Sequence, residues 1–236
     1  MERFSQIAKV TLLALSVSVA SGCSTISDVY GSIEKEVEDN RFENRINRSQ
    51  EYIVEARLLL NEGQAVKAKE MLDKAYQLYP RQASLHDTYK AYYDALGNER
   101  LAHLAMARYN KMVGQSNALN EKGRYAMTQM DALTLAGNLF KLSIIYHDEN
   151  TSTLVNIATL GYTTGDYELA KSSLRMLNRL GHLSPEASMI DFLIAEAEGN
   201  DDHMRIVRMI MRNSWPNSSQ TKFIETGVIT GQIHSS

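Results

Sequence analysis

The chain has 236 residues, of which 44% are hydrophobic and 22% charged, and its formal net charge is −3. This length suffices for one or two ordinary domains, and the slight acidity provides no basic surface field that would attract nucleic acid. Three prolines and one tryptophan are few, as is common in helix-rich chains. A single cysteine, Cys23, excludes an intramolecular disulfide framework.

The first 22 residues have the pattern of a secretory signal peptide. Arg3 and Lys9 form a short positive region, and an apolar stretch follows from residue 10 to residue 20. This stretch is shorter than the roughly 20 apolar residues that a membrane-spanning helix needs, but it fits the core of a cleaved signal. Small residues at positions 20–22 then lead directly into Cys23.

The tetrad Ala20-Ser21-Gly22-Cys23 resembles the bacterial lipobox, although alanine stands where leucine is the commoner residue. The resemblance implies cleavage of residues 1–22, after which Cys23 would carry a diacylglycerol and an N-acyl chain. Several acyl chains anchor a protein stably, because each buried CH₂ contributes about 0.8 kcal/mol. Ser24 stands where an aspartate would signal retention in the inner membrane, so the resemblance implies the outer membrane, facing the periplasm. The alternative is an ordinary cleaved signal followed by an unrelated cysteine.

Two tracks of small residues repeat every 34 residues through the rest of the chain. The first track is Ala68, Ala102, Ala136 and Ala170; the second is Gly63, Gly97, Gly165 and Gly199, with Asp131 in the one vacant position. A fixed period of this kind is typical of repeat architectures, in which stacked units bury a continuous core. Apolar residues also recur at steps of three and four between positions 58 and 75, which predicts helices. We therefore expect an all-α fold.

These tracks resemble the tetratricopeptide family, whose unit is two antiparallel helices with a small residue early in the second. The resemblance implies a right-handed superhelical solenoid of about five helix pairs, at residues 49–82, 83–116, 117–150, 151–184 and 185–218. Ala56 and Ala158 occupy the small position of the first helix, but Lys90 and Arg124 replace it in repeats two and three. The middle repeats are therefore expected to pack at altered angles.

Two segments flank the predicted repeats. Residues 23–48 contain the lipidated cysteine and a charged stretch, which we interpret as a tether or a frayed helix. Residues 219–236 are polar and are expected to form a frayed tail. In repeat five, Met204 and Arg208 replace the expected alanine and apolar residue, which indicates a terminal cap with a more hydrated outer face.

No motif typical of an enzyme is found in the sequence. The histidines, at positions 86, 103, 147, 182, 203 and 234, form no recognised metal-binding spacing. GxSxG, P-loop and GxGxxG motifs are absent. The sequence therefore predicts no enzymatic activity, no metal and no cofactor besides the covalent acyl groups at Cys23.

A protein-binding surface is predicted on the concave face, which the first helices form in the tetratricopeptide family. Mapped onto this sequence, that face presents Gln50, Ile53, Arg57, Leu60, Asn61, Tyr125, Gln129 and Tyr162. Apolar residues on an otherwise exposed face indicate a docking groove for an extended or helical segment of a partner. Tyrosines also crowd repeat two, at positions 89, 92, 93 and 109. Packing between helices is the main interpretation of these tyrosines, and a role at an interface is the alternative.

Among lipidated proteins of this architecture, the sequence resembles the pilotins of type IV pilus biogenesis, the PilF/PilW family. The resemblance covers the mature chain in length and layout, and the closing stretch RIVRMIMRNSWPNSSQ is similar to the family's last helix and its aromatic-Pro-x-Ser turn. Pilotins carry secretin subunits to the outer membrane and support their assembly, so the resemblance implies a secretin or other pilus-assembly components as partners. Two alternatives remain open: a TadD-type lipoprotein of the tight-adherence pilus, and an NlpI-like adaptor that recruits periplasmic proteases or peptidoglycan enzymes.

Overall fold

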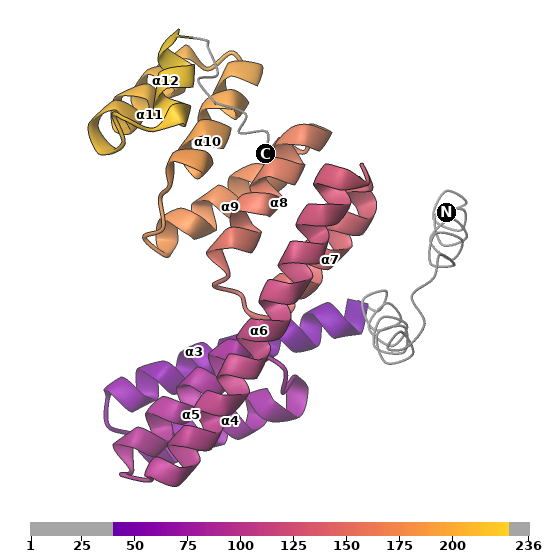
Figure 1. The fold of residues 1–236 in the computed structure, drawn as a ribbon. Helices are drawn as coiled ribbons and strands as arrows, with labels where there is room; N and C mark the ends of the chain where they lie inside the picture. Colours follow the sequence, from indigo (N-terminus) through magenta and orange to yellow (C-terminus); the bar gives the residue numbers. More distant parts are fainter. Residues whose placement is uncertain (1–39, 227–236) are drawn as a thin grey trace, which may run out of the picture. The chain divides into compact units, whose positions relative to one another are not determined.

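The computed structural model describes residues 40–226, and all regular structure in this range is helical, without a strand (Figure 1). The predicted all-α class is therefore confirmed for this part of the chain. The chain divides into two compact units, Met1–Arg48 and Ser49–Ser236, and the helix pairs belong to the second. Across residues 40–226, no helix combines the length and the apolar character needed to cross a bilayer. The predicted signal peptide and Cys23 lie outside the described residues and stay predictions.

The second helix of every predicted pair begins on one 34-residue register. These helices are α4 (Ala65–Leu78), α6 (Glu99–Gln129), α7 (Leu133–Tyr146), α9 (Tyr167–Arg179) and α11 (Asp201–Ser214). The first helices are α3 (Asn40–Asn61), α5 (Ala83–Ala95), α8 (Thr151–Thr164) and α10 (Pro185–Ala197), and α12 (Ser219–Thr226) follows the last pair. The period of the sequence is thus a period of the structure. Because α3 begins at Asn40, the last part of the predicted tether is helical.

A residue in the left-handed conformation lies two positions before the first residue of each of these second helices. The φ angles are +74° at Gly63, +66° at Gly97, +76° at Gly165 and +66° at Gly199, and Asp131 has φ +50°. Glycine adopts this conformation freely, whereas for a residue with a Cβ atom it costs about 1–2 kcal/mol of conformational free energy. The glycine track of the sequence therefore marks the five chain reversals, and aspartate is among the few other residues that tolerate one.

The alanine track marks the places where the two helices of a pair approach most closely. Ala68, Ala136 and Ala170 are fully buried, and Ala102 is 5% exposed. A Cβ atom added to Gly161 in α8 would lie only 2.7 Å from the backbone nitrogen of Ala170 in α9. Larger side chains on this track would force the helices apart, which explains its small residues.

Helix caps follow the same register. The side chains that accept a hydrogen bond from the backbone N–H three residues later are those of Asn98, Asn150, Asp166, Ser184, Asn200 and Ser218. Each satisfies one backbone N–H that the first turn of a helix leaves without an internal partner. Local sequence and global repeat therefore specify the same helix starts.

The structure differs from the predicted repeats at the boundary between residues 116 and 117. There the second helix of pair two and the first helix of pair three are one continuous helix, α6 (Figure 1). Residues 113–116 read Val-Gly-Gln-Ser and contain neither a proline nor a residue with positive φ. A lone glycine in a helix costs only about 1 kcal/mol. Nothing in this segment therefore stops the helix.

Ser116 stands where Asn150 and Ser184 cap the first helices of the following repeats. Inside α6, its Oγ donates to the carbonyl oxygen of Ser143 at 2.9 Å and accepts from Asn150 Nδ2 at 2.8 Å. The Oγ of Ser143 lies 2.8 Å from Thr153 Oγ1, and all four side chains are buried. Ser116 thus occupies the position of a helix cap in the repeat, but its side chain joins α6 to α7 and to the start of α8.

The repeat register predicts a small residue at position 124, where two helices would approach closely, but the close approach occurs at Gly123. Gly123 is buried, and a Cβ atom added there would lie 2.5 Å from Cε1 of Phe140 in α7. Arg124 itself is exposed and its Nη2 lies 2.9 Å from Glu121 Oε2. The face that α6 turns toward α7 is therefore rotated from the face that the repeat register predicts.

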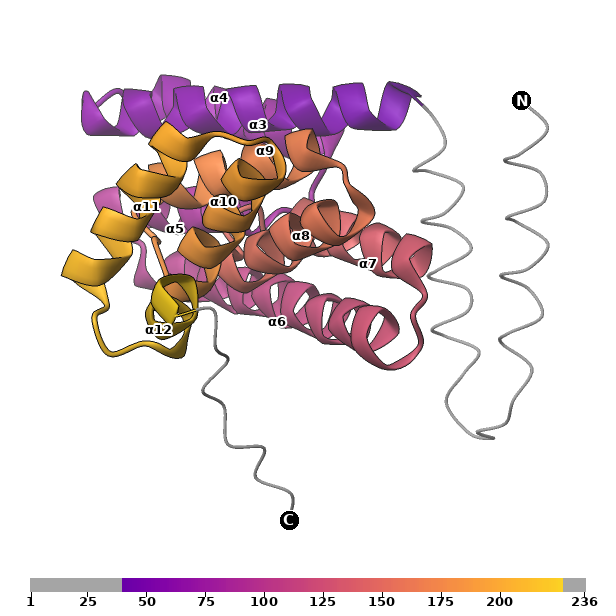
Figure 2. The same cartoon turned by 90° about the horizontal axis from the view of Figure 1, so that it is seen from above.

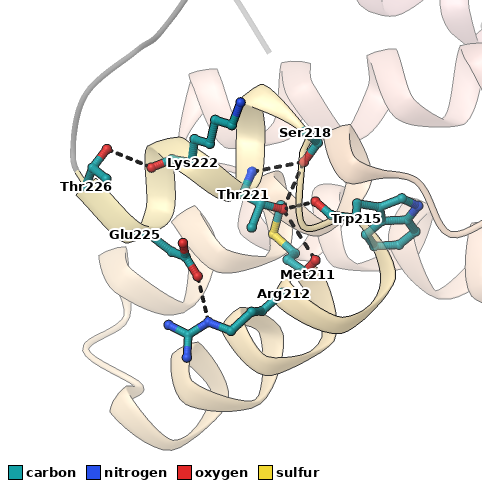
Figure 3. Close-up of polar contacts among 8 residues, drawn as sticks. All are labelled: Met211, Arg212, Trp215, Ser218, Thr221, Lys222, Glu225 and Thr226. Atoms are coloured by element: carbon teal, nitrogen blue, oxygen red, sulfur yellow. Dashed lines mark hydrogen bonds and ion pairs between the residues drawn. The ribbon is translucent and has the colours of Figure 1, made fainter.

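The prediction of a frayed tail from residue 219 is wrong for residues 219–226, which form α12 beside α10 and α11 (Figure 2). Thr221 and Ile224 are buried, and Thr221 Oγ1 donates to the carbonyl oxygen of Trp215 at 2.7 Å (Figure 3). Glu225 Oε1 accepts from Arg212 Nε at 2.6 Å. Because α12 begins 34 residues after α10, it takes the place of a first helix in a further repeat and covers the end of the array.

The outer face of α11 is also less hydrated than predicted. Ile206 is 50% exposed, Met209 57% and Ile210 37%. The opposite face buries Val207 and Met211 against Phe192 of α10 and Ile224 of α12. The last helix of the array is α12, which packs against α10 and α11. The helix α11 is therefore not the terminal one, and its outer face is partly apolar.

Substitutions at the reversal residues are expected to change stability in opposite directions. Asp131→Gly removes the steric cost of φ +50° and should raise the free energy of unfolding by about 0.5–1 kcal/mol, because the greater freedom of glycine in the unfolded chain offsets part of the gain. Gly165→Ala should lower it by about 1 kcal/mol. Urea unfolding followed by circular dichroism measures both, and a loss of stability in Asp131→Gly would contradict the strain argument.

A methyl group at position 123 is expected to overfill the contact between α6 and α7. Phe140 is fully buried and cannot yield, so Gly123→Ala should cost about 1–3 kcal/mol. Adding Phe140→Leu should recover part of this loss in a double-mutant cycle. The control is Gly114→Ala in the same helix, where the added Cβ meets open space and should stabilise by up to about 1 kcal/mol. Equal effects at 114 and 123 would refute the packing explanation.

Candidate functional site

One of the eight predicted surface residues lies in the core. Ile53 is fully buried and packs with Leu72 of α4 and Leu85 of α5. Its prediction as a docking residue is therefore wrong. The side of α3 that carries it is the side that contacts α4 and α5.

Gln50 and Arg57, also on α3, are engaged by the turn between α7 and α8. Gln50 Nε2 donates to the carboxylate of Asp148. An Arg57 guanidinium nitrogen lies 3.8 Å from Glu149 Oε1, and another lies 3.5 Å from Asp87 Oδ2. These two predicted residues thus meet acidic side chains of the same chain rather than an open groove.

The remaining predicted residues lie at or near the surface. They are Leu60 and Tyr162, which are half-buried, and Asn61, Tyr125 and Gln129, which are exposed. Tyr162 stacks on Tyr167, with ring centroids 6.3 Å apart. Within residues 40–226, no hydrogen bond, ion pair or ring contact joins these five to Gln50 or Arg57.

The continuous α6 accounts for this rearrangement. α7 follows α6 after a three-residue connection and packs back along it, so that the end of α7 returns to the middle of α6. There Tyr146 shares a core cluster with Ala83 at the start of α5 and Met112 of α6. The turn that follows Tyr146 therefore reaches α3 of the first pair. In a simple stack, the third pair would contact the second pair and not the first.

A pocket of about 250 Å³ lies instead between α4, α5 and α6. Its lining consists of Lys69, Asp73, Tyr76, His86, Tyr89, Tyr93, Leu101, Leu104, Ala105 and Arg108. Tyr76 and Leu104 are 42% and 48% exposed, so apolar surface is open to solvent at its edge. The walls are thus aromatic and aliphatic, with charged groups interspersed.

Tyrosine rings form one wall of this pocket. Tyr89 lies between two others, edge-on to Tyr76 with centroids 6.4 Å apart and stacked with Tyr93 at 6.0 Å. Tyr92 contacts Tyr93 edge-on at 5.1 Å. Such pairs hold rings in fixed orientations and contribute beyond their buried area. The crowding of tyrosines in repeat two therefore serves packing, and it also lines a cavity.

The Tyr89 hydroxyl belongs to a charged cluster with Lys69 and Asp73. It donates to Asp73 Oδ1 at 2.9 Å, and Lys69 Nζ lies 2.5 and 2.6 Å from the two Asp73 oxygens. Burial raises the pKa of Asp73, but the hydrogen bonds from Lys69 and Tyr89 outweigh burial and lower it. Burial and the adjacent Asp73 carboxylate raise the pKa of Tyr89. Asp73 is therefore ionised at neutral pH, with its charge balanced by Lys69.

His86 is buried beside this cluster. Its Nε2 lies 2.9 Å from the carbonyl oxygen of Pro80 and can donate to it. Burial and the nearby Arg108 charge lower the pKa of His86 below its ordinary value of 6.5, although the Pro80 contact opposes the shift. His86 is thus neutral at pH 7.

The arrangement provides binding groups and no nucleophile paired with a base. Among residues 40–226, no group of three or more His, Cys, Asp and Glu side chains is placed to hold a metal ion. The pocket residues outside the tyrosine cluster were not singled out from the sequence. The sequence gives a partial signal at Arg108: the same register position holds Leu142, Met176 and Ile210 in the three following repeats, but Lys74 in repeat one.

Acidic pH is expected to destabilise the protein through His86. Because its folded-state pKa lies below the unfolded value, the unfolded chain binds more protons, and stability falls as the pH drops below about 6.5. His86→Gln should therefore lose less stability between pH 7.5 and pH 5.5 than the wild type. Urea midpoints at the two pH values measure this. His103→Gln on α6, which changes an exposed ring, is the control and should keep the wild-type dependence; equal behaviour of the two variants would contradict the assignment.

No family model matches the chain, and no curated protein does. Among solved structures it is similar to one described as a functional characterisation of Pseudomonas aeruginosa pilF, with 15% identity, a TM-score of 0.38, and coverage of 78% of this chain and 100% of that one. It is also similar to a structure of PilW, described as a widely conserved type IV pilus biogenesis factor, with 13% identity, a TM-score of 0.28, and coverage of 75% and 98%. At these TM-scores the likenesses carry neither fold nor function, and the fold rests on the helices described above.

Proposed function

We propose that this chain is a lipid-anchored helical-repeat scaffold that binds partner proteins during pilus biogenesis at the outer membrane, where it aids the localisation and assembly of a secretin. The observation that supports the scaffold role is the 34-residue register of helix starts, caps and reversals. Stacked helix pairs of this kind form extended surfaces that serve to bind other proteins. The pilus context comes from the sequence resemblance, which includes the turn at residues 215–218.

Anchoring and binding would act together. Acyl chains at Cys23 hold the scaffold at the membrane because of the free energy of burying their CH₂ groups. A partner bound to the helical array then shares this membrane location. Its effective concentration near other membrane-bound subunits rises, which favours assembly without any chemical step.

The pocket between α4, α5 and α6 supports protein binding more directly than the predicted concave face does. It combines three tyrosines with open aliphatic surface at Leu104. Tyrosine is enriched at interfaces because its ring provides a large rigid contact and its hydroxyl a polar one. The α3 face, in contrast, already holds acidic residues of this chain at Gln50 and Arg57.

Deleting the gene is expected to abolish or strongly reduce surface pili and secretin multimers in outer-membrane fractions, and the wild-type gene should restore both. Cys23→Ala should move the protein to the soluble periplasmic fraction and fail to restore the multimers. Electron microscopy of pili and immunoblots of membrane fractions measure these outcomes. Cys23→Ala is also the control for anchoring, since persistent membrane association of this variant would refute the lipidation at Cys23.

Other outcomes separate the alternatives. Normal pili and secretin multimers in the deletion strain would refute the secretin role. Loss of tight-adherence pili alone would indicate the TadD-type function. A change in periplasmic protease or peptidoglycan hydrolase activity on adding the purified protein would indicate an adaptor.

A further inference from the structure

Arg108 is the one charged group of the α4–α6 pocket that the surrounding side chains leave unbalanced. It is exposed on α6, and within residues 40–226 it has neither an ion pair nor a hydrogen bond through its side chain. The other charged side chains that line the pocket, Lys69 and Asp73, pair with each other at 2.5–2.6 Å. His86 is neutral and turned to the Pro80 carbonyl. The pocket therefore presents one net positive charge beside an apolar wall.

The pocket's composition is specific to one place in the array. At the register position of Tyr89, the other repeats have Glu55, Gly123, Ile157 and Asp191. At that of Arg108, repeat one has Lys74 and the following repeats have only aliphatic or methionine side chains, so only repeat two combines a tyrosine with a basic residue. Helix stacking alone would not require a tyrosine wall with a free guanidinium at this one place. The combination suits a ligand that has both an aromatic group and a negative charge.

We propose that this pocket binds a short segment of a partner protein that presents an aromatic side chain next to a carboxylate. The aromatic group lies against Tyr76, Tyr93 and Leu104, whose side chains are at least partly exposed, and the carboxylate pairs with Arg108. Guanidinium and carboxylate form two parallel hydrogen bonds, which fixes the orientation of the segment. The proposal rests on the proposed function as a protein-binding scaffold and names the chemistry of the segment that the scaffold recognises.

Small probes test this chemistry without knowledge of the partner. The full chain is labelled with 3-fluorotyrosine, and ¹⁹F spectra are recorded during titration with N-acetyl-phenylalanine and, separately, with N-acetyl-phenylalanine amide, which lacks the charge. Tyr→Phe variants at positions 76 and 93 assign the pocket resonances. We expect the resonances of these two tyrosines to shift, and the acid to bind about five-fold or more tightly than the amide.

Arg108→Gln should abolish the preference for the acid while the amide still binds. Arg100→Gln removes the same charge from an exposed position on α6 outside the pocket and should keep the preference. Equal binding of acid and amide, an equal loss in both variants, or shifts confined to tyrosines other than 76 and 93 would each overturn the proposal. Such a failure would leave the pilus phenotype of the deletion strain untouched, so it is distinguishable from a failure of the proposed function.

Discussion

A chain reversal in the left-handed region, followed five residues later by a close helix contact, is the constraint on which this fold depends. Gly63 and Ala68 provide the pair in the first repeat, and Gly165 and Ala170 provide it in the fourth. The reversal fixes where the second helix starts, and the small side chain lets it approach the first helix. Asp131 shows that the reversal is required even where glycine is absent, because the backbone keeps its positive φ there. In the fifth repeat Met204 replaces the alanine, and one short helix later the described array ends.

The site depends on the junction between pairs two and three, where the helix does not stop. Residues 113–116 contain neither a proline nor a residue with positive φ, and α6 runs on to Gln129. Its length carries the start of α7 away from α5, and the return of α7 brings Asp148 and Glu149 to α3. The predicted concave face is closed at Gln50 and Arg57 for this reason. The open apolar surface lies instead at the pocket between α4, α5 and α6.

The sequence was sufficient to predict the helical class and the period, because both follow from the spacing and local preferences of glycine, alanine and the apolar residues. It did not predict the continuous α6. The 34-residue period predicts a helix end near residue 116, and the lack of a proline or a turn residue at 113–116 was not enough to argue against that end. The burial of Ile53 and the rotated face at Gly123 depend on contacts between distant segments. The pocket was missed for the same reason: Asp73, Tyr89 and Arg108 come from three helices, and only packing brings them together.

Sharing one helix between two repeats alters how the array holds together. In a simple stack each unit contacts only its neighbours, so terminal units can unravel while the rest stays folded. Here the hydrogen bonds of α6 pass without interruption from one repeat to the next, and the buried side chains of Ser116, Ser143 and Thr153 tie its middle to α7 and α8. The centre of the molecule therefore behaves as a single cooperative block, because a load on one side of it passes through a continuous helix rather than through a loop.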